Sequence, residues 1–241
     1  MPQVRLLALD SATEALALAV CGPRGDEVRD LPGGARASDL LLPELGALLV
    51  QAQLSKADLD GIAFVRGPGA FTGLRTACAV AQGLAFGLGK PVLALDSLML
   101  VAEQARLQQP DAAWLAQPLW VAMDARMGEL YAACYAWTGQ GWREQVAPAL
   151  YEPQALRQRW QPQTPHALTG TGLELGDVQA DAQLCLPIAG SRAAALASLA
   201  KQQAQVGPWL AAQDALPLYL RDKVALTTAE RQAAARAVEA P

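Results

Sequence analysis

Two stretches of the chain show the same order of short strands and helices. The first stretch runs from residue 4 to about 108, and the second runs from 119 to about 205. Each opens with a short apolar run that ends in an aspartate, Asp10 or Asp124. Further strand-like runs and then helix-length segments follow in both. Alternation of this kind predicts an α/β chain in which each half builds its own sheet.

Local patterns set the expected bounds of the elements. In the first half we expect strands at 4–10, 14–22, 26–31, 61–66 and 91–96, and helices at 38–53, 73–88 and 97–108. In the second half we expect strands at 119–125, 130–137, 142–149, 166–170 and 217–221, a helix from Pro153 and a helix at 191–205. Ser38 or Asp39 is the expected cap of the first helix, and Thr72 that of the second. The predicted domains are 1–110 and 111–221, followed by a charged, Ala-rich tail at 222–241.

Duplicated α/β halves are typical of the actin and hexokinase type of fold, in which nucleotide lies between two similar domains. We therefore predict two actin-like domains, each a mixed sheet flanked by helices. The duplication is one of pattern only, because we find no residue-level repeat.

Composition narrows the possible functions. The net charge of −4 and the pI near 5.1 predict that any role with RNA works through a partner, since proteins that grip RNA alone usually show a basic surface. Asp10 and Glu14 interrupt the first apolar run, and no later run is long enough to span a membrane. His166 is the only histidine, which excludes a two-histidine metal site within the chain, and no metal is expected. The four cysteines form no CxxC pair, so we expect reduced, buried thiols and a cytoplasmic protein.

The segment GPGAFTGLR (67–75) lies between a predicted strand and a predicted helix. Its glycines allow the backbone to turn tightly and to approach a ligand or another chain, and free N–H groups at a helix start attract anions. One interpretation is a remnant of a phosphate loop that uses Gly67, Gly69, Thr72 and Gly73. It is not a Walker loop, because the G-K-[ST] ending is missing. The alternative is a tight strand-to-helix turn with no ligand.

The segment LALDSATEA (7–15) resembles the first phosphate loop of actin-type ATPases through Asp10, Ser11 and Thr13. Working ATPases usually carry a glycine where Ala12 stands here, and the extra methyl group weakens the case for ATP hydrolysis. No cofactor is therefore expected, although weak nucleotide binding stays open. The alternative is a polar strand end in which Thr13 caps a turn.

The segment MDARMGELY (123–131) joins two predicted strands through a turn in which Gly128 is free to take a positive φ. Asp124 and Glu129 could act as a general acid and base. A surface ion cluster that includes Arg126 is the favoured alternative, since exposed ion pairs are common.

The predicted helix 73–88 carries no charge after Arg75 and is small or apolar on every face. A helix of this composition is usually buried all round, and a single sheet covers only one of its sides. We predict that it forms a subunit interface together with the leucine stripe of the preceding helix. The predicted contacts are Leu41, Leu45, Leu48, Leu49, Arg75, Thr76, Val80, Gly83 and Gly87. The alternative is burial under the second half of the same chain.

Taken together, these segments resemble the TsaB family, also called YeaZ. Besides the three motifs above, TGTG (169–172) and PLYLRDKVA (217–225) match, so the resemblance covers nearly the whole chain in order. It implies two actin-like domains and a non-catalytic partner of the tRNA threonylcarbamoyltransferase subunit TsaD. In the family this partner binds TsaD through its N-terminal helices, a small ATPase called TsaE joins the pair, and the same surface can form a homodimer.

One departure from the family concerns the start of the first interface helix. The family often has His-Ser or His-Thr there, whereas this chain has Ala37 and Ser38. A polar contact at Ala37 is therefore lost. A second function stays open beside the scaffold role, namely an independent actin-fold ATPase or kinase.

Overall fold

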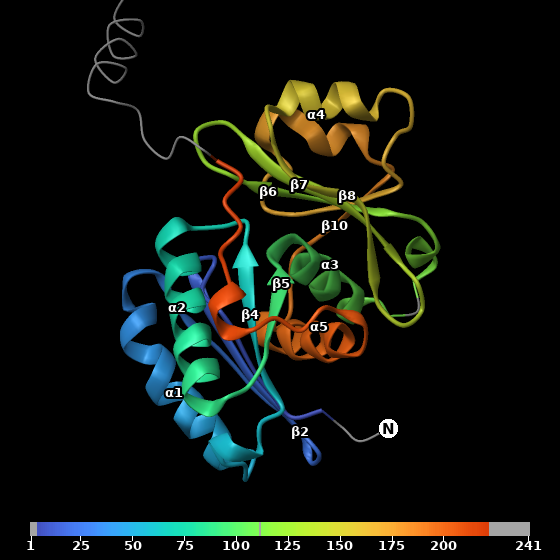
Figure 1. Cartoon of the computed structure of the whole chain (residues 1–241). Helices are drawn as coiled ribbons and strands as arrows, with labels where there is room; N and C mark the ends of the chain where they lie inside the picture. The colour runs from blue at the N-terminus through green and yellow to red at the C-terminus, as the bar shows by residue number, and fades with distance from the viewer. Residues whose placement is uncertain (1–3, 111, 222–241) are drawn as a thin grey trace, which may run out of the picture.

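The structure is a computed structural model that describes residues 4–110 and 112–221. This part of the chain contains two sheets of five strands each, with helices on both faces of each sheet (Figure 1). The prediction of an α/β fold with two mixed sheets flanked by helices, in the actin-like arrangement, is confirmed. The predicted tail at 222–241 lies outside the described residues.

The first sheet comes entirely from the first half of the chain. Its strands are β1 (Leu6–Asp10), β2 (Ala15–Gly22), β3 (Gly25–Pro32), β4 (Gly61–Gly67) and β5 (Val92–Asp96), in the order β3-β2-β1-β4-β5. The first three strands form an antiparallel meander, and β1, β4 and β5 are parallel. The helices of this half are α1 (Ala37–Gln51), α2 (Phe71–Leu88) and α3 (Ser97–Gln108).

The second sheet has the same topology. Its strands are β6 (Leu119–Asp124), β7 (Leu130–Trp137), β8 (Trp142–Tyr151), β9 (Ala167–Thr169) and β10 (Leu184–Leu186), in the order β10-β9-β6-β7-β8. Strands β6 to β10 thus repeat the places and directions of β1 to β5. The helices here are α4 (Pro153–Trp160), the 3₁₀ segment η4 (Leu175–Asp181) and α5 (Arg192–Val206). The described residues also contain four short 3₁₀ turns: η1 (Gly34–Arg36), η2 (Lys56–Asp58), η3 (Ala113–Ala116) and η5 (Ala212–Asp214).

The alternation of side chains along the strands builds a stack of five layers. In β1, Leu7 and Leu9 pack with α1 and α2 on one face of the first sheet, whereas Leu6 and Ala8 pack with α3 and α5 on the other. Helices α3 and α5 lie between the two sheets, and α4 with η4 covers the outer face of the second sheet (Figure 1). Since successive strand residues point to opposite faces, a sheet with two apolar faces must be covered on both sides.

Helix α5 belongs to the second half of the sequence but packs against β1, β2 and β3 of the first sheet. The division of the chain at residue 110 therefore stays a prediction. The two halves contact each other through a layer of two helices, α3 from the first half and α5 from the second.

Several local predictions are wrong. Helix α1 starts at Ala37, so Ser38 lies inside it, and α2 starts at Phe71, so Thr72 lies inside it; neither helix has a side-chain cap. The predicted strand at 217–221 is not a strand, because Pro217 has no N–H and only Leu218 bonds to the first sheet, through Arg66 O at 2.7 Å. The short edge strand β10 was not predicted.

Two further points concern exposure. Cys21, Cys78 and Cys134 are buried free thiols as expected, but Cys185 is exposed because it lies on the edge strand β10. In the described part of the chain, no helix combines the length and the hydropathy needed to cross a membrane.

Candidate partner-binding surface

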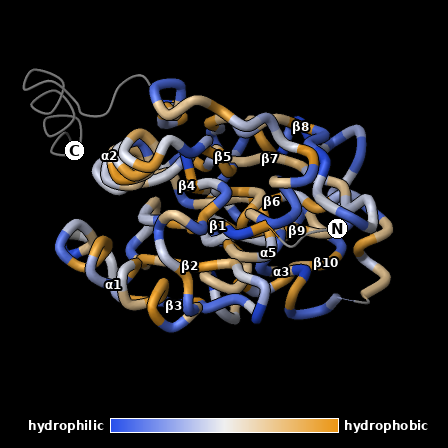
Figure 2. The backbone as a smooth tube through the Cα atoms, turned by 60° about the horizontal axis from the view of Figure 1, so that its bottom comes forward, coloured by the Kyte–Doolittle hydropathy of each residue, from blue (hydrophilic) through white to orange (hydrophobic). Residues whose placement is uncertain are grey.

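Helix α2 has a buried side and an open side. Leu74, Ala77, Ala81 and Ala85 face the first sheet and are buried. On the opposite side Arg75, Ala79 and Gly83 are exposed, and Phe86 is 83% exposed. Figure 2 shows α2 mostly in orange and white, the colours of apolar and near-neutral residues. Because Ala79 and Phe86 are exposed, an apolar side of the helix is left open within the described part of the chain.

This arrangement leaves α2 buried on one side only within the described part of the chain, whereas its composition is typical of a helix buried all round. It also contradicts the alternative of burial under the second half. That half lies on the other face of the first sheet, behind α3 and α5 (Figure 1). The outer side of α2 therefore has no cover within the described residues.

The leucine stripe of α1 occupies the core and not the surface. Leu41, Leu45, Leu48 and Leu49 are at most 5% exposed and pack with the strands of the first sheet. Their i, i+4, i+7, i+8 spacing is the stripe by which a helix buries one face, and here that face points to the sheet. The prediction that these four residues form interface contacts is therefore wrong, because they belong to the core. The outer side of α1 instead exposes Leu42, at 53%, and Val50, at 77%.

The predicted contacts on α2 lie at different depths. Arg75, Gly83 and Gly87 are exposed, and a Cβ atom built on either glycine would meet nothing within 4 Å. Thr76 is partly exposed and donates its hydroxyl to Thr72 O at 3.1 Å. Val80 is partly buried and packs against the core. The two exposed glycines leave room for another backbone to approach this side of the helix.

An aromatic stack lies at the start of α2. The Arg75 guanidinium sits 3.8 Å from the centre of the Phe71 ring, and Phe71 and Tyr219 have ring centres 4.9 Å apart. Arg75 Nε also donates to Tyr219 Oη at 3.1 Å. Tyr219 lies 144 positions after Arg75 in the sequence, so local sequence patterns gave no signal for its part in the surface.

Residues 207–221, here called the strap, run beside α2 toward the second half (Figure 1). Cys78 Sγ and Gln82 Nε2 both donate to Ala215 O, at 3.0 and 2.7 Å. At the far end, Arg221 pairs with Glu129 at 2.6 Å. The strap thus fixes α2 to the turn between β6 and β7 while leaving Leu216 exposed beside the helix.

A narrow apolar cavity of about 240 Å³ opens between α1 and α2. Leu42, Leu84 and Leu88 line it together with the core leucines of α1. Together with the exposed residues of α2 and the strap, this cavity gives the outer layer of the first half an indented apolar surface. We call the exposed sides of α1, α2 and residues 215–219 the outer helical surface.

The predicted phosphate-loop residues come together, but they contact one another. Ala70 N donates to Ala12 O at 2.8 Å, and Ser11 Oγ donates to Gly73 O at 2.8 Å. A Cβ atom on Gly73 would lie 1.7 Å from Ser11 O, and one on Gly69 would lie 2.6 Å from Ala12 O. In this structure the two glycines allow one loop backbone to rest on the other.

The remaining members of this group have separate surroundings. Thr13 Oγ1 accepts from Ala15 N at 3.2 Å and closes a local turn, and Thr72 is exposed. A Cβ atom on Gly67 would meet Leu218 O of the strap at 2.8 Å. These positions therefore serve local turns and close packing in the described structure.

Asp10 is fully buried and uses both carboxylate oxygens within the chain. One oxygen accepts from Ala12 N at 2.8 Å, and the other accepts from Arg192 Nε at 2.6 Å. Arg192 begins α5, 182 residues further along the sequence, so its role could not be predicted from local spacing. This ion pair joins the end of β1 to the central helix layer.

The turn at MDARMGELY behaves as a surface ion cluster. Gly128 has φ +79°, as predicted, and Arg126 and Met127 also have positive φ values of 65° and 56°. Asp124 lies 3.7 Å from Arg126, and both side chains are well exposed. Glu129 is paired with Arg221 instead, so the two carboxylates have separate cationic partners.

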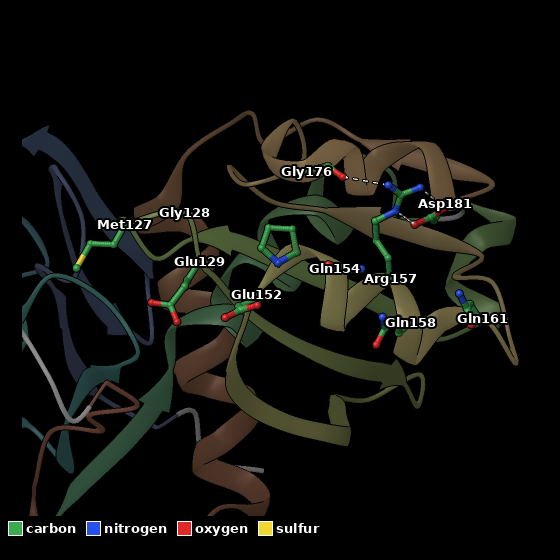
Figure 3. A pocket seen from close by; sticks show the side chains of 11 residues that line it. Met127, Gly128, Glu129, Glu152, Gln154, Arg157, Gln158, Gln161, Gly176 and Asp181 are labelled. Carbon is green, nitrogen blue, oxygen red and sulfur yellow. Dashed lines mark hydrogen bonds and ion pairs between the residues drawn. The ribbon is translucent and has the colours of Figure 1, made fainter. Parts of the chain in front are cut away.

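A wide pocket of about 810 Å³ lies beside this turn. Figure 3 shows Glu129 and Glu152 at one end, and Arg157 bonded to Gly176 and Asp181 at the other. The bidentate contact with Asp181 raises the pKa of Arg157. Asp124 does not line this pocket, so the pocket does not hold the acid–base pair considered from the sequence.

Metal binding has no support in the residues that the structure describes, where no group of three His, Cys, Asp or Glu side chains could hold an ion. His166 instead contacts Gln183 through Nδ1 at 3.1 Å.

These features define an α/β protein of the actin-like type whose first half presents an exposed apolar helix layer. A family model described as "TsaD: tRNA N6-adenosine threonylcarbamoyltransferase" matches residues 35–232. The tRNA threonylcarbamoyladenosine biosynthesis protein TsaB of Escherichia coli (strain K12) is 32% identical over 92% of this chain and 96% of its own length. The TsaB protein of Haemophilus influenzae is 38% identical over 54% of this chain and 53% of its own length.

Solved structures give the same assignment. A Pseudomonas aeruginosa protein described as similar to peptidase YEAZ has a TM-score of 0.79 and 34% identity, and the match covers 90% of this chain and 100% of that one. A second structure, described as YeaZ from Pseudomonas aeruginosa, has a TM-score of 0.76 with the same identity and coverage. The chain belongs to the TsaB (YeaZ) family, so the resemblance identified from the sequence is confirmed.

Proposed function

We propose that this chain is a non-catalytic scaffold subunit that binds a TsaD-type catalytic subunit. In that complex it supports the transfer of threonylcarbamoyl to adenosine in tRNA. Membership of the TsaB family and the TsaD family model support a role in this tRNA modification. A scaffold of this kind needs only to bind the productive conformation of its partner better than other conformations.

The observation that carries the proposal is the outer helical surface. Monomeric proteins rarely leave a large apolar patch open, and such a patch usually marks an interaction site. Here Phe86, Leu216 and Leu42 are all more than half exposed on neighbouring parts of that surface. Exposed Ala79 and Gly83 between them allow a partner helix to come close to the backbone of α2.

The same surface supports the other predicted partners. In the absence of the catalytic subunit, a second copy of this chain would cover it as a homodimer. A TsaE-type ATPase would join the heterodimer, and tRNA would be reached only through the partners, consistent with the net charge of −4.

Two arginine substitutions test the surface. Ala79→Arg and Gly83→Arg place a charge on the open side of α2, where the structure offers free space at Gly83. Ala147→Arg adds the same charge on exposed β8, far from this surface in sequence and in fold, and is the matched control. Light scattering coupled to size exclusion, with and without the cognate TsaD, measures association.

We expect both α2 variants to stay folded by circular dichroism and to lose association, whereas Ala147→Arg pairs normally. Normal pairing by both α2 variants would place the interface elsewhere and overturn this assignment of the surface.

The alternative function is an independent ATPase or kinase. Ala12 and the backbone packing of Gly69 and Gly73 weigh against it, because the space that a phosphate would need is used by the chain itself. Purified chain should show no turnover alone, and it should restore tRNA modification when added to TsaD, TsaE and the adenylate-forming enzyme. Robust turnover by the chain alone would refute the non-catalytic role.

A further inference from the structure

A cavity of about 470 Å³ lies on the outer face of the second sheet, at the end of α4. Its walls come from β6, β7 and β8, and from the loop at 162–166 that follows α4. The cavity is separate from the outer helical surface, which covers the first sheet. Its volume falls within the range of about 300–1,000 Å³ that is usual for small-molecule sites.

Two indole rings form the aromatic part of this cavity. Trp120 and Trp160 meet edge to face, with ring centres 5.4 Å apart and planes inclined by 73°. Trp160 is almost fully buried, and its ring packs against that of Trp120. Trp120 is partly exposed and lines the cavity. The Nε1–H of Trp160 is buried and has no hydrogen-bond partner among the described residues, which is unusual for a buried donor.

The charge of the cavity is positive although the chain as a whole is acidic. Arg159 supplies this charge, and no Asp or Glu lines the cavity. Arg159 is exposed, and within the described part of the chain it has no carboxylate at ion-pair distance. The guanidinium lies 6.0 Å from the centre of the Trp120 ring, at the outer limit of a cation–π contact, so the ring does not hold it firmly.

The remaining polar lining offers both donors and acceptors. It consists of three carboxamides and a hydroxyl: Gln117, Gln145, Gln163 and Thr164. Carboxamides can pair with the alternating donors and acceptors on the edge of a nucleobase. An aliphatic anion would leave the indole unused, and an uncharged ring would leave the guanidinium unused.

We propose that this cavity binds a nucleotide, with the base stacked on Trp120 and the phosphate paired with Arg159. Base–aromatic stacking and charge-assisted bonds from arginine to phosphate are the usual means of holding a nucleotide without a metal. The nucleotide comes either as a free mononucleotide or as part of a single-stranded RNA, and the second source would be an exception to the indirect contact with RNA that the net charge of −4 predicts. The proposal goes beyond the scaffold role and is independent of it, because the cavity lies in the other half of the molecule.

The test uses isothermal calorimetry on the full chain with four probes: AMP, adenosine, inorganic phosphate and a short single-stranded RNA. Arg159→Gln removes the charge, and Trp120→Leu removes the ring while keeping an apolar side chain against the core. Arg143→Gln makes the same charge change on exposed β8 outside the cavity and is the matched control.

We expect AMP to bind more tightly than adenosine or phosphate alone. Arg159→Gln should weaken AMP binding about tenfold and leave adenosine binding unchanged, whereas Trp120→Leu should weaken the binding of both by about tenfold. Arg143→Gln should bind like the unaltered chain. Quenching of tryptophan fluorescence by AMP should be reduced in Trp120→Leu, which gives a second readout on the folded protein.

Tighter binding of the RNA than of AMP would identify a strand as the source, and tighter binding of AMP would identify a free nucleotide. The proposal is overturned when none of the probes binds, or when binding is the same in Arg159→Gln and Trp120→Leu as in the unaltered chain. Neither outcome depends on association with TsaD, so failure here and failure of the scaffold proposal are distinguishable.

Discussion

The burial of the outer helix α2 and that of the central helix α5 both differ from what their sequences suggest. Helix α2 carries no charged side chain after Arg75, yet one side of it is exposed. Helix α5 carries Arg192, Ser198 and Gln202, yet it lies between the two sheets. These three polar side chains are satisfied in the interior, because each of them bonds to a buried carboxylate of the first half.

This difference shows that the burial of a helix face in this fold depends on which layers pack against it. The central layer has a sheet on both sides and must satisfy its polar groups internally. The outer layer of the first half has a sheet on one side only, and its apolar outer side is left for another molecule. Four changes test this contrast, in order of decreasing expected effect.

Glu103→Ala should give the largest loss of stability. The Glu103 side chain is fully buried in α3 and accepts from Arg106, Trp142, Ser198 and Gln202 at 2.5–2.9 Å. Its loss leaves a guanidinium and several donors without a partner in the central layer. We expect the free energy of unfolding to fall by about 3–5 kcal/mol in urea titration.

The control for this change is Glu144→Ala, on an exposed position of β8. It should change stability by no more than about 0.5 kcal/mol. Similar losses in both variants would show that the central layer does not depend on its buried carboxylate.

Leu48→Ala tests the two sides of α1. Leu48 is fully buried, so the truncation should cost about 2–5 kcal/mol by leaving a cavity against the first sheet. Leu42→Ala makes the same chemical change on the exposed side and should cost about 0.5 kcal/mol or less. Equal stability of both variants, with association lost only in Leu48→Ala, would show that the leucine stripe forms the interface and not the core.

Asp96→Asn tests the contact between the central layer and the second sheet. Asp96 caps α3 through Leu98 N and accepts from Tyr135 Oη of β7 at 2.5 Å. Burial raises the pKa of Asp96 from 3.8 to about 6, against the opposing effect of these hydrogen bonds. The folded state therefore binds the proton more tightly than the unfolded state does.

The contribution of this group to stability is complete below about pH 4 and is lost as the pH rises through about 6. Asn keeps a capping side chain but has no proton to lose, so the decline should disappear. We expect the variant to lack roughly 1–2 kcal/mol of pH-dependent change between these limits in thermal or urea unfolding. The same slope in both proteins would assign the pH dependence to other groups.

Phe86→Ser should have the smallest effect on stability and a clear effect on association. Its ring is 83% exposed on α2, so the free energy of unfolding should change by about 0.5 kcal/mol or less. Association with TsaD or with a second copy should weaken about tenfold, measured by analytical ultracentrifugation.

Val206→Ser is the matched control, because Val206 is 77% exposed at the end of α5 and away from the outer helical surface. Equal association of the two variants would mean that exposure of apolar residues does not distinguish this surface from the rest of the molecule.

The sequence by itself determined the fold class, most strands and the family. Short apolar runs bounded by turn residues place β1 to β9 to within a few residues, since the composition and length of such a run are local properties. The repeat of strand and helix order predicted two sheets, and the structure shows the same topology in both. The turn glycine Gly128 was also predicted correctly, because a positive φ is a local demand on the backbone.

Only the tertiary structure decided what covers each helix. Periodicity identified the stripe from Leu41 to Leu49 as a face that avoids water, but a sheet and a partner helix satisfy that face equally well. The pairing of Asp10 with Arg192 and the stacking of Tyr219 on Phe71 join residues more than 140 positions apart. Such contacts depend on how the layers stack, and the order of residues along the chain carries no local signal for them.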